Sequence, residues 1–339
     1  MNDMTPLAKL TIKDWESDQE VRWCPGCGDY AILKAVQRTM VEIGADPAQT
    51  VFVSGIGCSS RFPYYMASYG FHTIHGRAPA FATGIKLANP DLDVWLVTGD
   101  GDGMSIGGNH TMHVIRRNLN TQILLFNNEI YGLTKGQYSP TSRVGTTSPT
   151  TPMGSVDRPA QPCAFALGAG GRFIARGFDV SKELSGVLKA AHAHQGAAFV
   201  EIFQNCIVYN KDVFEDFAAP KGAEARQLWL KHGEPMLFNK GTQGIALDAQ
   251  ALKLKVVDVV DGDWQSAGVI VHDVTNRSVA HMLVELPFGP FPMALGVIYD
   301  DPAPSYESAV LTQDATARAG KSADLAKLLA KGQTWTVED

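Results

Sequence analysis

Oxygen-bearing side chains follow two apolar runs near the middle of the sequence. Asp100, between two glycines, comes shortly after the run 94–97, and Asn128 comes shortly after the run 123–126. Such runs are typical of buried parallel strands, whose ligands bind beyond the carboxyl ends of the sheet. Carboxylate and amide oxygens suit Mg²⁺, and a helix beginning near Met104 would point its amide groups at an anion. Gly-Asp-Gly alone is a common turn, but the second polar strand end favours a magnesium site that holds a phosphorylated ligand.

The five cysteines, at positions 24, 27, 58, 163 and 206, are too few and too scattered for a disulfide framework. Cys24-Pro-Gly-Cys27 at a helix start would suit a thiol-disulfide motif, although the polar segment before it supplies no preceding strand. Zinc would require a second closely spaced pair, which the sequence lacks. An iron-sulfur cluster needs four thiolates, and Cys58 and Cys206 follow predicted strands that could end beside the pair. From the pair alone, redox, metal-binding and purely structural roles all stay open.

Alternating strands and helices between residues 31 and 203 predict an α/β fold with a doubly wound, mostly parallel sheet. The predicted helices are 31–43, 77–87, 163–170 and 181–194, and the predicted strands are 51–54, 94–97, 123–126, 172–175 and 198–203. Segment 131–162 is rich in Gly, Ser, Thr and Pro, and we expect it to cover the cofactor or contact a subunit. We divide the chain into an N-terminal arm (1–22), a cofactor-binding domain (23–235) and a C-terminal extension (236–339).

Composition restricts the classes of partner. The 339 residues are 45% hydrophobic and 19% charged, with a net charge of -6. These values predict a globular protein and disfavour nucleic acid or an anionic membrane as a general partner. The first twenty residues lack the apolar core of a signal peptide, and no run is long enough to span a membrane. We therefore expect a cytoplasmic protein.

Five motifs in one order resemble the β subunit of 2-oxoacid:ferredoxin oxidoreductases, and the resemblance extends over about residues 15 to 240. They are Trp-Cys-Pro-Gly-Cys-Gly-Asp from residue 23, Gly-Ile-Gly-Cys-Ser-Ser-Arg from 55, His-Gly-Arg-Ala from 75, Gly-Asp-Gly-Asp-Gly from 99 and Asn-Asn-Glu-Ile-Tyr-Gly-Leu-Thr-Lys-Gly-Gln from 127. The stretch from Gly-Asp-Gly to Asn-Asn is similar to the thiamine diphosphate signature. Gly-Glu-Pro-Met-Leu-Phe from residue 233 is similar to the 2-oxoglutarate branch, also called 2-oxoglutarate synthase.

The resemblance implies three cofactors: thiamine diphosphate, Mg²⁺ and one 4Fe-4S cluster. The implied cluster ligands are Cys24, Cys27, Cys58 and Cys206, and the implied magnesium ligands are Asp100, Asn128 and the backbone carbonyl of Ile130. The residues expected around thiamine diphosphate are Ile56, Gly57, Cys58, Ser59, His75, Gly99, Gly101, Asp102, Gly132, Leu133 and Thr134. His75 is expected to contact the cofactor or to transfer a proton near it. Cys163, in an apolar helix, is expected to be a packed free thiol.

The implied reaction is the thiamine-dependent oxidative decarboxylation of 2-oxoglutarate with coenzyme A, giving succinyl-CoA, CO2 and reduced ferredoxin. The same enzyme run in reverse would fix CO2. Arg61 and Lys135 are candidates to bind substrate carboxylates, and these two cations favour a dicarboxylic substrate. No motif supplies the carboxylate that activates thiamine. The resemblance assigns it to an α subunit in an (αβ)2 assembly, so the isolated chain is expected to be inactive.

Three other functions stay open at this point. The same scaffold could act on pyruvate or on a branched or aromatic 2-oxoacid. The chain could be a subunit of a non-redox thiamine decarboxylase with structural cysteines. It could also be an electron-transfer or scaffold subunit with a vestigial cofactor site.

Overall fold

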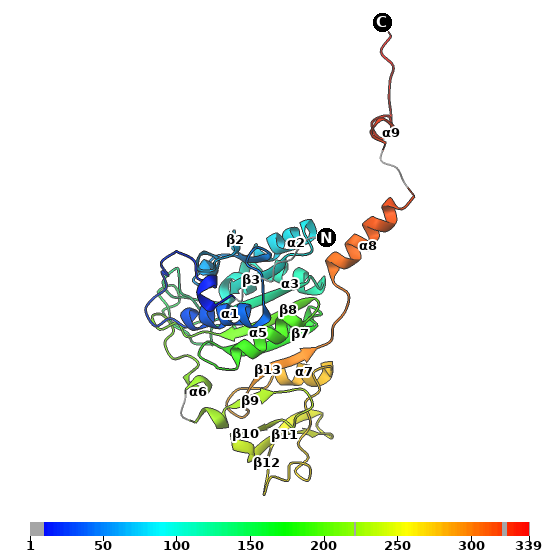
Figure 1. Cartoon of the computed structure of the whole chain (residues 1–339). Helices are drawn as coiled ribbons and strands as arrows, with labels where there is room; N and C mark the ends of the chain where they lie inside the picture. The colour runs from blue at the N-terminus through cyan, green and yellow to red at the C-terminus, as the bar shows by residue number, and fades with distance from the viewer. Residues whose placement is uncertain (1–9, 220–221, 321–323, 339) are drawn as a thin grey trace.

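An eight-stranded sheet forms the centre of the molecule, with strand order β2-β1-β3-β4-β8-β7-β13-β9 (Figure 1). The computed structural model describes residues 10–219, 222–320 and 324–338. The strands of this sheet are β1 (Thr50–Ser54), β2 (Tyr69–His72), β3 (Asp93–Gly99), β4 (Thr121–Asn127), β7 (Phe173–Phe178), β8 (Ala197–Phe203), β9 (Gln227–Leu230) and β13 (Met293–Asp300). All neighbouring strands are parallel except β13 and β7. The predicted mostly parallel α/β sheet is confirmed.

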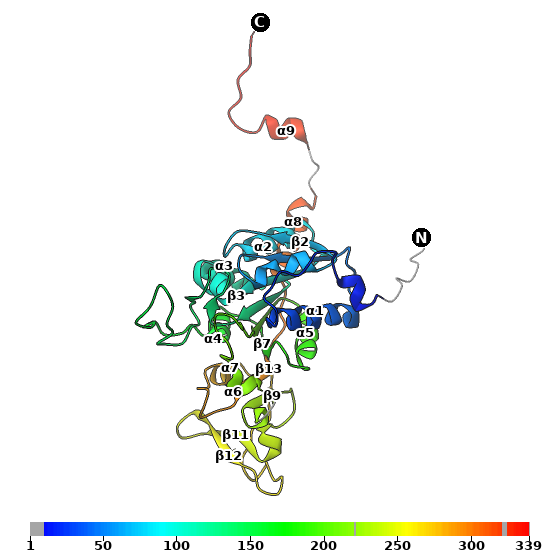
Figure 2. The same cartoon turned by 90° about the vertical axis from the view of Figure 1, so that its left-hand side faces the viewer.

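Helices cover both faces of the sheet because successive strand residues point to opposite sides. On one face, α1 (Asp29–Ile43) and α5 (Leu184–Ala193) pack on side chains such as Phe52 and Trp95. On the other face, α2 (Ala78–Ala88), α3 (Gly108–Arg116), α4 (Pro162–Gly168) and α7 (Arg277–Val284) pack on a second buried cluster (Figure 2). The central strands β1, β4 and β8 are buried along their whole length, as expected for a sheet covered on both faces.

The parallel register brings four polar segments to one edge of the sheet. Ser54 of β1 pairs with Val97, Gly99 of β3 pairs with Phe126, and Asn127 of β4 pairs with Phe203. The chain segments that leave β1, β3, β4 and β8 therefore emerge side by side. These segments contain the glycines, the oxygen donors and two of the cysteines selected from the sequence.

The C-terminal part of the chain shares a strand with the main sheet. β13, from within the expected extension 236–339, lies between β7 and β9. The strands β10 (Leu237–Phe238), β11 (Gln243–Asp248) and β12 (Lys253–Asp258) form a separate antiparallel sheet. α8 (Tyr306–Arg318) and α9 (Leu325–Leu329) extend away from the body in both views. The extension is therefore partly integrated into the cofactor-binding domain.

The predicted helices and strands between residues 31 and 203 are all present, with ends shifted by a few residues. The aromatic segment 62–76 contains the edge strand β2, which follows a short 3-10 helix, η2 (Ser59–Tyr65). Segment 131–162 contains β6 (Gln137–Tyr138), which pairs with β5 (Ile130–Tyr131). The remaining short elements are η1 (Ile12–Trp15), the π-helix η3 (Asp102–Ile106), α6 (Glu215–Ala218), η4 (Ala223–Ala225) and η5 (Asn239–Gly241). No helix in the described residues is both long and apolar enough to cross a membrane.

Candidate active site

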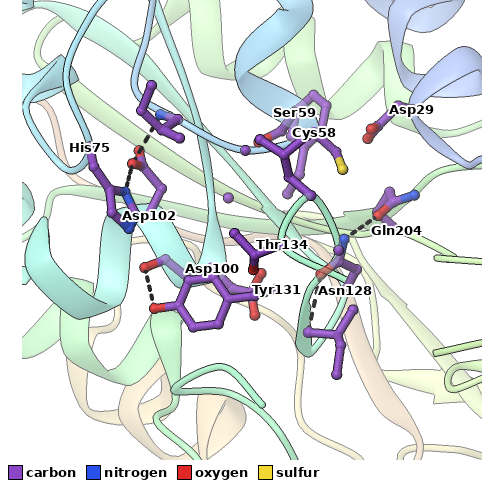
Figure 3. A pocket seen from close by; sticks show the side chains of 18 residues that line it. Asp29, Cys58, Ser59, His75, Asp100, Asp102, Asn128, Tyr131, Thr134 and Gln204 are labelled. Carbon is purple, nitrogen blue, oxygen red and sulfur yellow. Dashed lines mark hydrogen bonds and ion pairs between the residues drawn. The ribbon is translucent and has the colours of Figure 1, made fainter. Parts of the chain in front are cut away.

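A cavity of about 130 Å³ lies at the carboxyl ends of β1, β3, β4 and β8 (Figure 3). Every residue predicted to bind magnesium or thiamine diphosphate lines this cavity. Those residues are Ile56, Gly57, Cys58, Ser59, His75, Gly99, Asp100, Gly101, Asp102, Asn128, Ile130, Gly132, Leu133 and Thr134. Asp29, Phe126, Tyr131 and Gln204 also line it and were not selected from the sequence. We call this space the strand-end cavity.

Two hydroxyl groups hold the carboxylate of Asp100 in place. Ser139 and Thr141 donate to its Oδ2 atom at 2.5 and 2.6 Å. Both come from segment 131–162, which thus folds back beneath the strand ends. Burial raises the pKa of Asp100, and the two hydroxyl bonds oppose this shift. A divalent cation beside this carboxylate would compensate the cost of burying its charge.

The carboxylate of Asp102 links several segments around the strand-end cavity. Its carboxylate accepts from the backbone amides of Ile56 and Gly76 and from the Thr98 hydroxyl, at 2.7 to 3.0 Å. The Nδ1 atom of His75 lies 2.5 Å from Asp102 Oδ1, which fixes the orientation of the imidazole. No hydrogen bond to His75 Nε2 is present among the described residues, so this nitrogen can bind a ligand.

Gly101 allows the ring of Tyr131 to pack against the strand-end loop. A Cβ atom at position 101 would lie 2.3 Å from Tyr131 Cε1, far inside the contact distance. The Tyr131 hydroxyl donates to the Gly101 carbonyl at 3.0 Å. The packing of Tyr131 therefore requires glycine at position 101.

A second cavity of about 190 Å³, the cysteine cavity, adjoins the first. It is lined by Cys24, Cys27, Cys58 and Cys206, and it shares Cys58, Asn128, Gly132, Leu133 and Gln204 with the strand-end cavity. A Cβ atom on Gly132 would lie 3.5 Å from the sulfur of Cys58 and 3.6 Å from that of Cys206. The four cysteines thus surround one space, although no three His, Cys, Asp or Glu side chains in the described residues are arranged to hold a metal ion.

The environment of Cys27 and Cys58 differs from that of the catalytic thiols in a thiol-disulfide enzyme. Burial raises the pKa of Cys27 well above its ordinary value and that of Cys58 to about 12, and neighbouring acidic groups add to both shifts. Catalytic thiols in disulfide exchange have lowered pKa values. Cys206 is buried, Cys27 and Cys58 are half-buried, and Cys24 is exposed. Four thiols gathered around one cavity are a donor set that iron can hold as thiolates. Cys163 lies apart, buried in α4, where its sulfur contacts Glu201.

Asp29 lies buried at the start of α1. It lines the strand-end cavity, and neither carboxylate oxygen has a hydrogen-bond partner among the described residues. Burial raises its pKa to about 7. Asp29 belongs to the cysteine motif from residue 23, and the sequence pattern predicts no role for it.

The two predicted substrate-binding cations differ in position. Arg61 lines the cysteine cavity and a third space of about 440 Å³ that also includes Ile56, Gly57 and Leu133 of the strand-end cavity. Its Nε atom donates to the Tyr65 hydroxyl at 3.0 Å. Lys135 is exposed, has a positive φ of 77° and lines none of these three cavities. A role for Lys135 in substrate binding stays a prediction.

The chain is similar to known proteins over most of its length. Residues 55–202 match the family model for the thiamine pyrophosphate enzyme C-terminal TPP binding domain. The chain is 48% identical over 335 residues to 2-oxoglutarate oxidoreductase subunit KorB of Mycobacterium tuberculosis, covering 96% of this chain and 88% of that protein. It is 49% identical over 205 residues to subunit beta of 2-oxoacid:ferredoxin oxidoreductase 1 of Aeropyrum pernix, covering 60% of this chain and 64% of that protein.

A solved structure is also similar over nearly the whole chain. It is the 2-oxoglutarate:ferredoxin oxidoreductase from Magnetococcus marinus with 2-oxoglutarate, coenzyme A and succinyl-CoA bound. The TM-score is 0.77 at 34% sequence identity, and the match covers 96% of this chain and 97% of that chain.

Proposed function

Because this chain belongs to the β subunits of the 2-oxoacid:ferredoxin oxidoreductases, we propose that it oxidises 2-oxoglutarate with coenzyme A in complex with an α subunit. The products are succinyl-CoA, CO2, a proton and two electrons, and the electrons leave one at a time to ferredoxin. A strongly reducing ferredoxin would run the same reaction towards CO2 fixation. The observation that carries the proposal is the junction of two cavities, one with metal and phosphate donors and the other with four cysteines.

Thiamine diphosphate and Mg²⁺ fit the strand-end cavity. Asp100, Asn128 and the Ile130 carbonyl would hold the metal ion, and the glycine-rich backbone at 99–101 would approach the diphosphate. When bound, thiamine diphosphate supplies the nucleophilic carbon and the electron sink for decarboxylation. The protein contributes orientation: Ser139 and Thr141 fix Asp100, and Asp102 fixes His75 beside the cofactor position.

A 4Fe-4S cluster fits the cysteine cavity, with Cys24, Cys27, Cys58 and Cys206 as its ligands. Cys58 and Gly132 belong to the walls of both cavities. Electrons from substrate oxidation would therefore cross only the shared wall to reach the cluster. This adjacency favours a redox enzyme over a thiamine decarboxylase with structural cysteines.

The substrate is 2-oxoglutarate in this proposal, with Arg61 as the group that binds its distal carboxylate. Arg61 lines the space next to the strand-end cavity, and a guanidinium group can bind a carboxylate through two hydrogen bonds. The similar enzyme from Magnetococcus marinus has 2-oxoglutarate, coenzyme A and succinyl-CoA bound. The Mycobacterium tuberculosis relative is also named for 2-oxoglutarate.

The α subunit completes the site by supplying the carboxylate that activates thiamine. Within the described residues, the carboxylates of the strand-end cavity are Asp29, Asp100 and Asp102. Asp100 and Asp102 are bound by neighbouring donors, and Asp29 lies at the cysteine motif. We therefore propose that the active form is an αβ assembly, in the form (αβ)2.

Initial rates of the anaerobically co-expressed α and β subunits test this function. We expect reduction of a viologen that requires 2-oxoglutarate, coenzyme A, thiamine diphosphate and Mg²⁺ together, with lower kcat/KM for pyruvate and branched 2-oxoacids. The β chain alone should be inactive. CO2 release without acceptor reduction would indicate a non-redox decarboxylase. Turnover by the β chain alone would contradict the role of the α subunit.

A further inference from the structure

Gln204 joins the two cavities through one side-chain amide. It directly follows β8, is 1% exposed, and lines both the strand-end cavity and the cysteine cavity. Its Oε1 atom accepts from Asn128 Nδ2 at 2.8 Å, a bond drawn in Figure 3. Its Nε2 atom donates to Cys27 Sγ at 3.1 Å and to the Asn205 carbonyl at 2.8 Å.

The surrounding groups fix which end of this amide faces each cavity. The carbonyl oxygen of Asn205 can only accept, so Nε2 must point towards it and towards Cys27. Oε1 then faces Asn128 and requires the Nδ2 atom of that residue as its donor. The backbone amide of Gln204 also donates to the Asn127 carbonyl at 2.8 Å, which holds the whole residue against the end of β4.

This orientation has a consequence for the metal donor. With Nδ2 of Asn128 bound to Gln204, the Oδ1 atom is the side-chain atom left for a cation, and it also accepts from the Ile130 amide at 3.2 Å. If the Asn128 amide rotated by half a turn, an N–H group would face the metal ion. Gln204 prevents that rotation because its oxygen cannot donate.

It has a second consequence for the cysteine cavity. Reduction of a 4Fe-4S cluster adds one electron, and the negative charge on its thiolate ligands increases. A hydrogen bond to a ligand sulfur stabilises the reduced form more than the oxidised form, so it raises the reduction potential. The N–H group of Gln204 makes such a bond to Cys27.

We propose that Gln204 is a positioning residue that orients Asn128 towards Mg²⁺ and raises the reduction potential of the cluster. The proposal rests on the proposed function, which supplies the cluster and the metal ion. One buried side chain would then connect the strand-end cavity, where electrons are released, with the cysteine cavity, where the cluster receives them.

The test is a redox titration of the complete αβ complex, purified anaerobically and followed by electron paramagnetic resonance. Gln204→Met keeps the length of the side chain and removes the N–H donor. We expect its cluster potential to fall and its dissociation constant for thiamine diphosphate at limiting Mg²⁺ to rise about tenfold or more, as for other groups that orient metal ligands. Asn210→Ala is the control, because Asn210 donates to the Asn128 carbonyl at 2.9 Å without a described contact to sulfur. Its potential should equal that of the wild type.

A wild-type cluster potential in the Gln204→Met variant, with full iron content, would overturn the proposal. If the Met variant loses iron, unchanged cofactor affinity in that variant would still contradict the connection. A wild-type complex without iron would instead refute the proposed function.

Discussion

The hydroxyl oxygen of Tyr65 accepts from Nε of Arg61 at 3.0 Å and from the backbone amide of Arg22 at 2.9 Å. Tyr65 is buried, and its ring packs edge-to-face on Trp23, the residue before Cys24. The guanidinium group of Arg61 is therefore held by the same aromatic pair that supports the cysteine motif. A buried side chain, that of Tyr65, therefore orients the guanidinium group of Arg61.

Tyr65→Phe removes the hydroxyl that orients Arg61 and keeps the ring that packs on Trp23. We expect kcat/KM for 2-oxoglutarate to fall about tenfold, equivalent to about 1.4 kcal/mol, with little change for pyruvate, which lacks the distal carboxylate. Steady-state rates with both substrates provide the measurement. Tyr69→Phe, at an exposed position of β2, is the matched control. An equal decrease for both substrates would argue against this role of Tyr65.

Thr141→Val removes one of the two hydroxyl donors to Asp100 at nearly constant side-chain volume. Because groups that orient a metal ligand commonly affect affinity 10- to 100-fold, we expect the Mg²⁺ concentration for half-maximal thiamine diphosphate binding to rise about tenfold. Fluorescence or calorimetric titration of the complex measures this change. Thr150→Val, in the exposed part of the same segment, should leave it unaltered. Identical titrations for the two variants would exclude an orienting role for Thr141.

Gly101→Ala places a Cβ atom where the ring of Tyr131 packs. Overpacking of this kind destabilises proteins by about 1–3 kcal/mol, so we expect denaturant unfolding of the cofactor-free protein at lower concentration. Gly186→Ala is the control, and we expect it to change the free energy of unfolding in the opposite direction. Gly186 lies within α5 with open space around its Cα, and helix propensity should stabilise that variant by up to about 1 kcal/mol. A Gly101 variant as stable as the wild type would show that Tyr131 has room to move.

Cys206→Ala removes the proposed cluster ligand that is farthest along the sequence from the other three. Cys163→Ala removes the thiol in α4, outside the cysteine cavity. The first variant should lose most of its iron, acid-labile sulfide and visible absorbance, because a four-iron cluster requires four thiolates. The second should keep all three. Iron and sulfide analysis of both variant complexes, purified anaerobically, measures this difference. Retention of iron in the Cys206 variant would remove that residue from the ligand set.

The sequence predicts the strand-end cavity well because its residues follow strands whose parallel order places them together. Asp100 and Asn128 are examples, since each follows a run of apolar residues that the sheet buries. Cys206 is another, because it follows β8, the neighbour of β4. In these cases local patterns and one rule of parallel sheets determine the position of a side chain.

The remaining parts depend on long-range packing that no local pattern encodes. Ser139 and Thr141 reach Asp100 only because segment 131–162 folds beneath the strand ends. Gln204 has no motif of its own, and its importance comes from the partners at its two amide atoms. The position of β13 between β7 and β9 could not be predicted either, because β13 follows the other strands of the main sheet in the sequence and lies within the expected extension.

Anaerobic mixing of the oxidised αβ complex with 2-oxoglutarate, followed through cluster absorbance and electron paramagnetic resonance, tests the junction of the two cavities most directly. We expect 2-oxoglutarate to reduce the cluster without added mediator, and coenzyme A to accelerate this reduction. Complex depleted of thiamine diphosphate or Mg²⁺ should not respond. A cluster that stays oxidised while CO2 is released, or a complex that contains no iron, would refute the proposed electron transfer between the two cavities.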